Sequence, residues 1–277
     1  MKQTFTLKWL PFQTLEHNTA LNTPSAIHNP ESFRLRLARL SDIPAMAQIC
    51  KEAFWLSPID QYLAPKAPEH PEDFLRIMLH SIQTRFALSN SLTIVACTPT
   101  TEVNNEIIVG YGLFFRKGND IGARGFVRQK GILTLLALWW LRCWYSFSHW
   151  ISNKIRPDRV TDFAALGAFR VSIKEDDSKY WTEPERLDRW HAGSVVVAPA
   201  YQRRGIGQLI MTSVIERSEK EGVPLGLEAT PAGEALYSKL GFEMLGDFSC
   251  HIVGNERGGI MIRYPERWEA RYISSAA

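Results

Sequence analysis

The first regular pattern along the chain is an alternation of apolar and basic residues. It covers residues 32–40, SFRLRLARL, and a period of two predicts a half-buried strand. In residues 41–55 apolar residues recur every three or four positions, and Ser41 or Asp42 can cap the first turn. A strand followed by an amphipathic helix is therefore expected.

A second helix and two strands come next. Residues 71–86 predict the helix, with Pro71 in its first turn, where proline is tolerated. Two short apolar segments, 92–97 and 105–115, predict strands. The polar residues between them predict a hairpin with a long loop.

Residues 117–188 interrupt this order and contain the most apolar segment of the chain, GILTLLALWWLRCWYSFSHWI at 131–151. Its uncharged part ends at Arg142, too early to span a hydrocarbon layer of about 30 Å. We expect no stable membrane insertion. A packed helix, an apolar lid, a dimer surface and a helix lying in a membrane interface all stay open for this segment. The polar residues 173–188 predict a loop.

The rest of the chain alternates strands and helices. The predicted elements, in chain order, are a strand at 189–199, a helix that ends near Gly222, a strand at 224–229, a helix at 232–240, and strands at 248–253 and 258–264.

Composition and charge narrow the class of protein. The net charge is only +3, so no strong global field favours nucleic acid or an anionic membrane. The four cysteines show no metal-ligand spacing, which predicts buried thiols in a reducing compartment and no metal site. The N-terminus lacks the apolar segment of a secretory signal, so a cytoplasmic location is expected. We expect an N-terminal extension at 1–31 and one domain at 32–277, within which 117–188 is an apolar, helical insertion.

The turn between the strand at 189–199 and the following helix is the sharpest candidate for chemistry. Gly205 and Gly207 let an anion approach the main chain, and the first amides of a helix have no helical partners. The helix dipole and the side chains of Arg203 and Arg204 add positive charge. We expect a diphosphate cradle. A dinucleotide-binding fold would need the motif G-x-G-x-x-G, and a P-loop would need GK[ST]; this turn has neither motif. The remaining alternative is a basic helix start that binds no ligand.

Two segments carry a resemblance to a known family. VVVAPAYQRRGIG resembles motif A of the GCN5-related N-acetyltransferases (GNAT), and LYSKLGF resembles their motif B. With the predicted element order, the resemblance covers residues 32–264 apart from the insertion. It implies an α/β protein with the GNAT acyl-CoA N-acyltransferase fold, whose mixed sheet splays between its fourth and fifth strands. The insertion and the extension give the chain the look of a fungal member.

The resemblance also implies acetyl-CoA as co-substrate, with no metal. The amide of Val195 would face the thioester carbonyl, and Val197 would pair with the pantetheine arm. The residues assigned to cofactor binding are Val195, Val196, Val197, Gln202, Arg203, Arg204, Gly205, Ile206, Gly207, Gln208 and Thr230. Thr230 stands where family members often have asparagine, and a hydroxyl replaces only one of the amide's hydrogen bonds.

The resemblance places Tyr237 where a phenol protonates the departing thiolate. His191 is the first candidate for the general base, because an imidazole titrates near neutral pH. Strand alternation puts it on the same face as Val195, with the small Gly193 leaving room for substrate between them. Glu228, at the end of the next strand, is the second candidate for the base.

Glu183 and Glu185 are third candidates for the base, as residues of the predicted loop. We therefore expect direct transfer of an acetyl group from acetyl-CoA to a primary amine in a ternary complex. The tryptophans of 131–151 favour a small apolar or aromatic acceptor. Protein lysine acetylation, a non-catalytic CoA-binding interaction module and a homodimer stay open.

Overall fold

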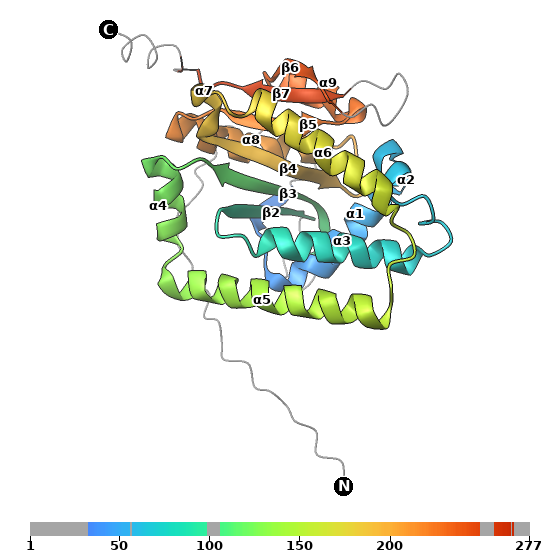
Figure 1. Ribbon diagram of the computed structural model, residues 1–277. Helices are drawn as coiled ribbons and strands as arrows, with labels where there is room; N and C mark the ends of the chain where they lie inside the picture. The colour runs from blue at the N-terminus through green and yellow to red at the C-terminus, as the bar shows by residue number, and fades with distance from the viewer. Residues whose placement is uncertain (1–32, 56, 99–105, 250–257, 267, 269–277) are drawn as a thin grey trace. The chain divides into compact units, whose positions relative to one another are not determined.

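The computed structural model describes residues 33–55, 57–98, 106–249, 258–266 and 268. The extension predicted at 1–31 lies outside them. The described residues form a mixed seven-stranded sheet in the order β1-β2-β3-β4-β5-β7-β6 (Figure 1). The strands are β1 (Arg34–Leu37), β2 (Ser91–Cys97), β3 (Ile108–Lys117), β4 (Arg189–Val197), β5 (Leu225–Ala229), β6 (Glu243–Asp247) and β7 (Gly259–Arg263).

The α-helices cover both faces of this sheet. They are α1 (Ile43–Phe54), α2 (Pro58–Leu63), α3 (Pro71–Phe86), α4 (Ile121–Gln129), α5 (Ile132–Ile155), α6 (Phe163–Tyr180), α7 (Pro184–Leu187), α8 (Ile206–Glu221) and α9 (Pro231–Lys239). The predicted mixed fold and element order are confirmed. The short α2 was not predicted. The strand predicted at 248–253 is misplaced, because β6 covers Glu243–Asp247 and residues 248–249 are not in a strand; residues 250–253 lie outside the described residues.

Strands β1 to β4 form an antiparallel half-sheet with a core on each face. On β3, Tyr111, Leu113 and Phe115 pack toward α1 and α3, which we call the α1 face. Residues in the alternate positions pack toward α8, on the α8 face. Gly112 permits the close approach of α8, because an added Cβ would lie 2.5 Å from a methyl carbon of Ile210.

Strands β5, β7 and β6 form the second half-sheet, and the end of α6 covers its α1 face. Tyr180 and Trp181 pack on Ile260 and Ile262 of β7, and the Tyr180 hydroxyl donates to the carbonyl of Asp247 at 3.0 Å. The loop predicted at 173–188 is therefore wrong. The segment looked polar because α6 buries only Asp176 and Tyr180 in its last turns and exposes the residues between them.

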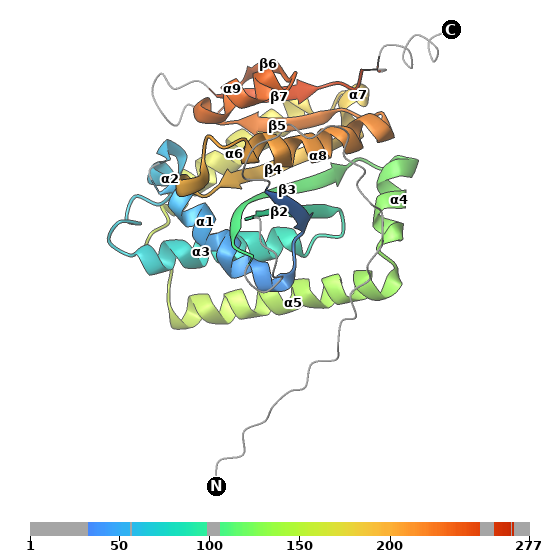
Figure 2. The same ribbon diagram turned by 180° about the vertical axis from the view of Figure 1, so that it is seen from behind.

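Helix α5, which contains the apolar segment, packs beside α3 (Figure 2). The rings of His80 on α3 and His149 on α5 stack at 3.7 Å, and His149 Nε2 lies 2.7 Å from the Gln83 side-chain oxygen. Burial and the charge of the neighbouring ring lower the pKa of His80 to about 4. No residue of α5 is fully buried, so its apolar side chains are largely in contact with solvent. Among the described residues, no helix is long and apolar enough to cross a membrane.

The cysteine prediction is correct for two residues and wrong for a third. Cys50 and Cys97 are buried free thiols, whereas Cys143 is exposed on α5. Cys250 lies outside the described residues. Burial raises the pKa of the Cys50 thiol to about 11, so this side chain behaves as a small core residue.

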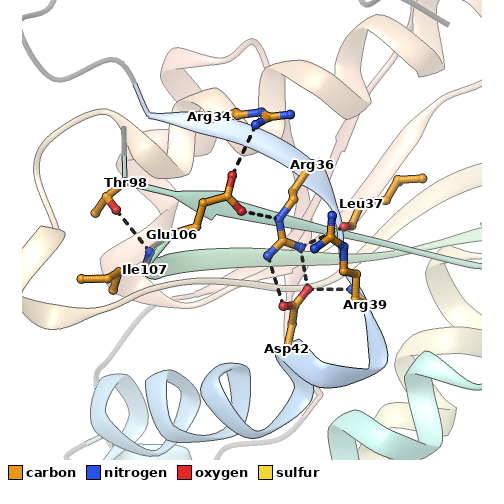
Figure 3. A network of polar contacts seen from close by, with 8 residues as sticks. All are labelled: Arg34, Arg36, Leu37, Arg39, Asp42, Thr98, Glu106 and Ile107. Atoms are coloured by element: carbon orange, nitrogen blue, oxygen red, sulfur yellow. Dashed lines mark hydrogen bonds and ion pairs between the residues drawn. The ribbon is translucent and has the colours of Figure 1, made fainter. Parts of the chain in front are cut away.

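A largely buried ion-pair network joins β1, the start of α1 and the residues before β3 (Figure 3). The guanidinium of Arg36 donates to Asp42 at 2.6 and 3.1 Å and to Glu106 at 3.0 Å. Asp42 also accepts the main-chain amide of Arg39 at 2.6 Å. The Asp42 hydrogen bond raises the pKa of Arg36 further above its ordinary value.

We predict that Asp42→Asn lowers the free energy of unfolding by about 2 to 3 kcal/mol, because the Arg36 charge then stays buried with a weaker partner. Arg34 is the matched control, since it pairs with Glu106 from an exposed position at 3.4 Å. Arg34→Gln should cost about 0.5 kcal/mol or less. Urea unfolding measures both values, and equal losses would contradict the assignment.

Candidate functional site

Strands β4 and β5 separate soon after they meet. Their parallel pairing covers Trp190 with Leu225, His191 with Gly226, and Ala192 with Leu227. Beyond this point β4 stays paired with β3 and β5 with β7. The predicted splay is confirmed, and Gly193 and Glu228 are the first residues on its two sides.

A β-bulge in β4 changes which residues face which side. Leu113 of β3 opposes Ser194, but its neighbour Phe114 opposes Ala192, so Gly193 is the extra residue. The bulge places His191 on the α1 face, whereas Val195 lies on the α8 face. The expectation that these two side chains share a face is wrong.

The space predicted beside Gly193 is also filled. An added Cβ on Gly193 would collide with the ring of Phe115, which covers this glycine on the α1 face. Gly193 therefore permits the packing of β3 against the bulge and leaves no substrate channel there.

The main chain of β4 has alternate amides available in the splay. The amide of Ala198 donates to the carbonyl of Val109 at 2.9 Å. Because antiparallel pairs alternate in their hydrogen bonding, Val196 also bonds to β3, and the amides of Val195 and Val197 point away from β3 toward the gap. This is the orientation that the predicted contacts with a thioester and a pantetheine arm require.

The side chain of Val196 lies elsewhere. It is buried in the core under α1, on the opposite face from Val195 and Val197. Its predicted contribution to cofactor binding has no support from this placement, because both its main chain and its side chain are already engaged.

The N-terminus of α8 follows directly and presents free main-chain amides. Arg203 and Gly205 have left-handed backbone conformations, with φ of 64° and 81°. The first helical bond of this region joins the amide of Leu209 to the carbonyl of Gly205 at 2.9 Å. In helix geometry, the amides that precede this bond have no helical acceptor. They belong to Ile206, Gly207 and Gln208.

The two glycines of this turn have different roles. An added Cβ on Gly205 would meet no atom within 4 Å, so the space above it is open to a ligand. An added Cβ on Gly207 would lie 3.2 Å from a methyl carbon of Leu236, so this glycine lets α9 approach α8. The buried side chain of Ile206 anchors the first turn in the core, while its amide stays at the helix end.

The polar side chains of the turn fold back onto it. The Gln202 amide donates to the Val197 carbonyl at 3.1 Å. The Arg204 guanidinium lies 5.1 Å from the centre of the Tyr201 ring and donates to the Ala200 carbonyl at 3.2 Å. Arg203 and Gln208 are exposed.

Two of the predicted catalytic residues form one pair. His191 Nε2 lies 2.9 Å from Glu228 Oε2. The His191 side chain is 10% exposed and that of Glu228 is 39% exposed, so Glu228 presents the accessible group. Within the described part of the chain, His191 Nδ1 is buried without a hydrogen-bond partner.

Sequence reasoning missed the residues that surround this pair. The indole of Trp181 lies over Gly226 and meets the His191 ring edge-on, with 5.5 Å between ring centres. The guanidinium of Arg189 lies 4.3 Å from the centre of the Trp181 ring. Trp181 was missed because it lies in the segment predicted as a loop. The sequence did contain one indication of its role, a single tryptophan shortly before a predicted strand.

The local electrostatics favour a charged carboxylate. Partial burial opposes ionisation of Glu228, but the charge and hydrogen bond of His191 outweigh it and lower the pKa of Glu228 below its usual range. Burial lowers the pKa of Arg189 to about 10, while the charge of Glu228 opposes that shift.

Tyr237 approaches from the other side of the sheet. Its ring packs over Gly233 and meets Phe242 edge-on, and it contacts the core of the α8 face. Burial raises the pKa of Tyr237 to about 12, which keeps the phenol protonated at neutral pH. Thr230 is exposed at the N-cap of α9, where its side chain makes no capping hydrogen bond.

The remaining candidates lie apart from the pair. Glu183 and Glu185 belong to the N-cap and first turn of α7 and are exposed. Between α7 and β7, Arg186 donates to the hydroxyl of Tyr264 at 3.2 Å, which fixes this short helix against the second half-sheet.

The site is thus a gap between two parallel strands beside a helix N-terminus, and comparisons with known proteins indicate the class of protein that carries it. The sequence model of the acetyltransferase (GNAT) domain matches residues 163–244. An acetyltransferase of the fungus Stachybotrys chartarum is 24% identical over 235 residues, which is 83% of this chain and 88% of the relative. The probable acyltransferase SID5 of Ajellomyces capsulatus is 44% identical over 61 residues, or 20% of this chain and 45% of that protein.

A solved structure shares the fold. It is that of histone acetyltransferase HPA2 and related acetyltransferase from Corynebacterium glutamicum, with a TM-score of 0.53, 17% identity, and coverage of 84% of this chain and 97% of that one. The chain is therefore similar to the GNAT acetyltransferases, in sequence over residues 163–244 and in fold over most of its length. It is a transferase of the N-acetyltransferase or acyltransferase kind, and its fold implies acetyl-CoA as co-substrate.

We predict that His191→Gln raises the pKa of the Glu228 carboxyl, because burial remains when the opposing charge is lost. Because the pKa of Glu228 is lowered in the folded state, this carboxyl stabilises the fold at pH values above its ordinary pKa of about 4.3. The stabilisation is lost as the pH falls through the folded-state pKa. Carboxyl carbon NMR titration measures this. His80→Gln is the remote control and should leave Glu228 unchanged; an unshifted Glu228 in His191→Gln would contradict the pairing.

Proposed function

We propose that this protein transfers an acetyl group from acetyl-CoA to a primary amine by direct attack in a ternary complex. The observation that carries the proposal is the continuity of the site. The unpaired amides of Val195 and Val197 in the splay lead, along the same chain segment, to the free amides at the start of α8. A thioester joined to a diphosphate through a long arm has the shape and polarity to bind both.

The start of α8 would hold the diphosphate. Its amides point outward, the helix dipole adds positive charge, and Arg203 and Arg204 lie beside it. Arg204 now bonds within the turn, so it would have to turn outward to contact a phosphate. The side-chain amide of Gln202 donates a hydrogen bond to the Val197 carbonyl. The pantetheine arm would displace it where the arm pairs with β4.

The splay would polarise the thioester. The Val195 amide, held by the sheet, is a fixed dipole that can donate to the carbonyl oxygen as negative charge develops there. The amine nitrogen forms a bond to the carbonyl carbon and the carbon–sulfur bond breaks. Tyr237, which is protonated before the step, gives its proton to the leaving thiolate and regains one from solvent after the products leave.

The proton lost by the amine would pass to the His191–Glu228 pair. Glu228 is the more exposed member and is charged, so it attracts the ammonium form of the acceptor and contacts it. His191 lies behind it and holds the carboxylate through Nε2. We therefore assign the contact with substrate to Glu228 and a positioning role to His191, reversing the order of the sequence-based candidates.

We further infer that the acceptor is a small polar amine. The tryptophans that favoured an apolar acceptor lie on the exposed side of α5, which packs on α3. A cavity of about 610 Å³ lies instead between α1 and the turn at Pro199, beside Gln202. Lys51 and Glu52 line it together with Trp55, Pro71 and Pro199, which suits a polar amine of modest size that also has an apolar part.

A non-catalytic CoA-binding module is the second candidate, and turnover separates the two. A panel of small polar amines, read by release of free thiol, should reveal acceptor-dependent turnover with at least one amine. Acetyl-CoA binding accompanied only by slow hydrolysis across the panel would favour the binding module. Turnover with lysine peptides alone would favour protein acetylation.

We predict that Gly205→Glu abolishes acetyl-CoA binding, because the new side chain fills the open space with negative charge at the helix end. The expected loss in isothermal titration is on the order of 100-fold or more, since it removes both the space and the favourable field. Gly131→Glu is the control, because Gly131 also has a left-handed φ, of 74°, and equally open surroundings; it should bind as the wild type does. Unchanged binding in Gly205→Glu would refute the cradle.

We predict that Glu228→Gln and Tyr237→Phe each lower kcat about 10² to 10⁴-fold, the usual contribution of acid–base groups, with little change in acetyl-CoA affinity. Tyr145→Phe, on α5, is the matched control for the loss of a phenol. His191→Gln should lower kcat less and shift the pH profile through Glu228. Full activity in Glu228→Gln would overturn the assignment of the pair.

A further inference from the structure

Helix α5 has an amphipathic pattern whose apolar side faces outward. Six residues, spaced three or four apart, lie on one face of the helix. They are Ile132, Leu136, Trp139, Cys143, Phe147 and Trp150. The five large apolar side chains among them are each at least 54% exposed. The inner face carries Tyr145 and His149, and His149 stacks on α3.

The charges around this face have one sign. From residue 121 to residue 156 the sequence has no aspartate or glutamate. Its basic residues are Arg124, Arg128, Lys130, Arg142, Lys154 and Arg156. Lys130 turns inward, where its ammonium donates to the Ser91 carbonyl at 2.7 Å, but the other five are exposed. The small net charge of the whole chain conceals this local concentration.

We propose that the outer face of α5 docks on the surface of an anionic lipid bilayer. Exposed tryptophan and phenylalanine side chains prefer the boundary between headgroups and acyl chains, and neighbouring cations attract anionic headgroups. Arg142 flanks the aromatic residues in the shallow depression formed with Trp139 and Trp150. Lys154 follows on the same face one turn after Trp150.

The charge pattern favours a membrane over a second copy of the chain. Symmetric pairing of two α5 faces would bring Arg142 and Lys154 against the same cations of the partner, with no carboxylate on the helix to neutralise them. An anionic bilayer supplies the missing charge. The docked helix lies along the surface, so this proposal involves no spanning segment.

Docking in this way leaves the candidate active site open. Helix α5 contacts α3, on the side of β2, whereas the splay lies between β4 and β5 and is flanked by α8 and α9 (Figures 1 and 2). The proposal therefore does not depend on the assigned chemistry, and its failure would leave the catalytic proposal unaffected.

Co-sedimentation of the full chain with large unilamellar vesicles tests the proposal. We expect binding to phosphatidylcholine vesicles that contain about 30% phosphatidylserine to be at least about 10-fold tighter than to pure phosphatidylcholine. It should weaken as salt rises from about 0.1 to about 0.5 M. Binding should also shift tryptophan emission to shorter wavelength, because α5 carries four of the nine tryptophans.

The variant W139Q/F147Q/W150Q should lose at least about 10-fold in vesicle affinity, because it removes the three aromatic anchors of this face, although the exposed Trp140 and Trp144 remain beside it. It should still bind acetyl-CoA. The control F163Q/V171Q removes equally exposed apolar side chains from α6 and should bind vesicles normally. Absence of wild-type binding, or equal binding by both variants, would overturn the proposal. A third outcome would also overturn it: the wild type is a dimer, the triple variant is a monomer, and neither binds vesicles. In that case a second copy of the chain covers α5.

Discussion

The short contact between β4 and β5 is the constraint on which the rest of the site depends. The two strands pair at Ala192 and Leu227 and then follow different partners, β3 and β7. Each half-sheet has its own supporting helices, with α8 against β2 to β4 and α9 against β5 and β7. The gap is therefore built into the packing, and it leaves main-chain amides that a ligand can satisfy.

The gap and the helix end are held at a fixed separation by the chain itself. Val197 ends β4 and Gly205 caps α8, and Ile206 and Ile210 anchor that helix in the core of the same half-sheet. A ligand that reaches from the splay to the helix end must therefore match a preset length. This preorganisation reduces the ordering cost of binding and favours one orientation of a long, charged molecule.

The sequence predicted the features that arise from local pattern. Strand and helix periods, the proline and glycines around residues 199–207, and their order along the chain were enough for the element order and the exposed helix start, whereas the GNAT fold and the splay came from the resemblance in the two motifs. They could not reveal the bulge at Gly193, which depends on the pairing with β3 and moves His191 to the other face. The end of α6 was missed because only one residue in four contacts the sheet, and with it the position of Trp181 beside His191.

The central claim is that free main-chain amides of the splay and of the α8 start bind one ligand together. Amide chemical shifts in a ¹⁵N-labelled protein titrated with coenzyme A measure this directly. The account predicts that the largest saturating changes fall on Val195, Val197 and the amides of residues 205–208, with one common dissociation constant. Changes confined to other parts of the chain, or none at these positions at saturation, would contradict it.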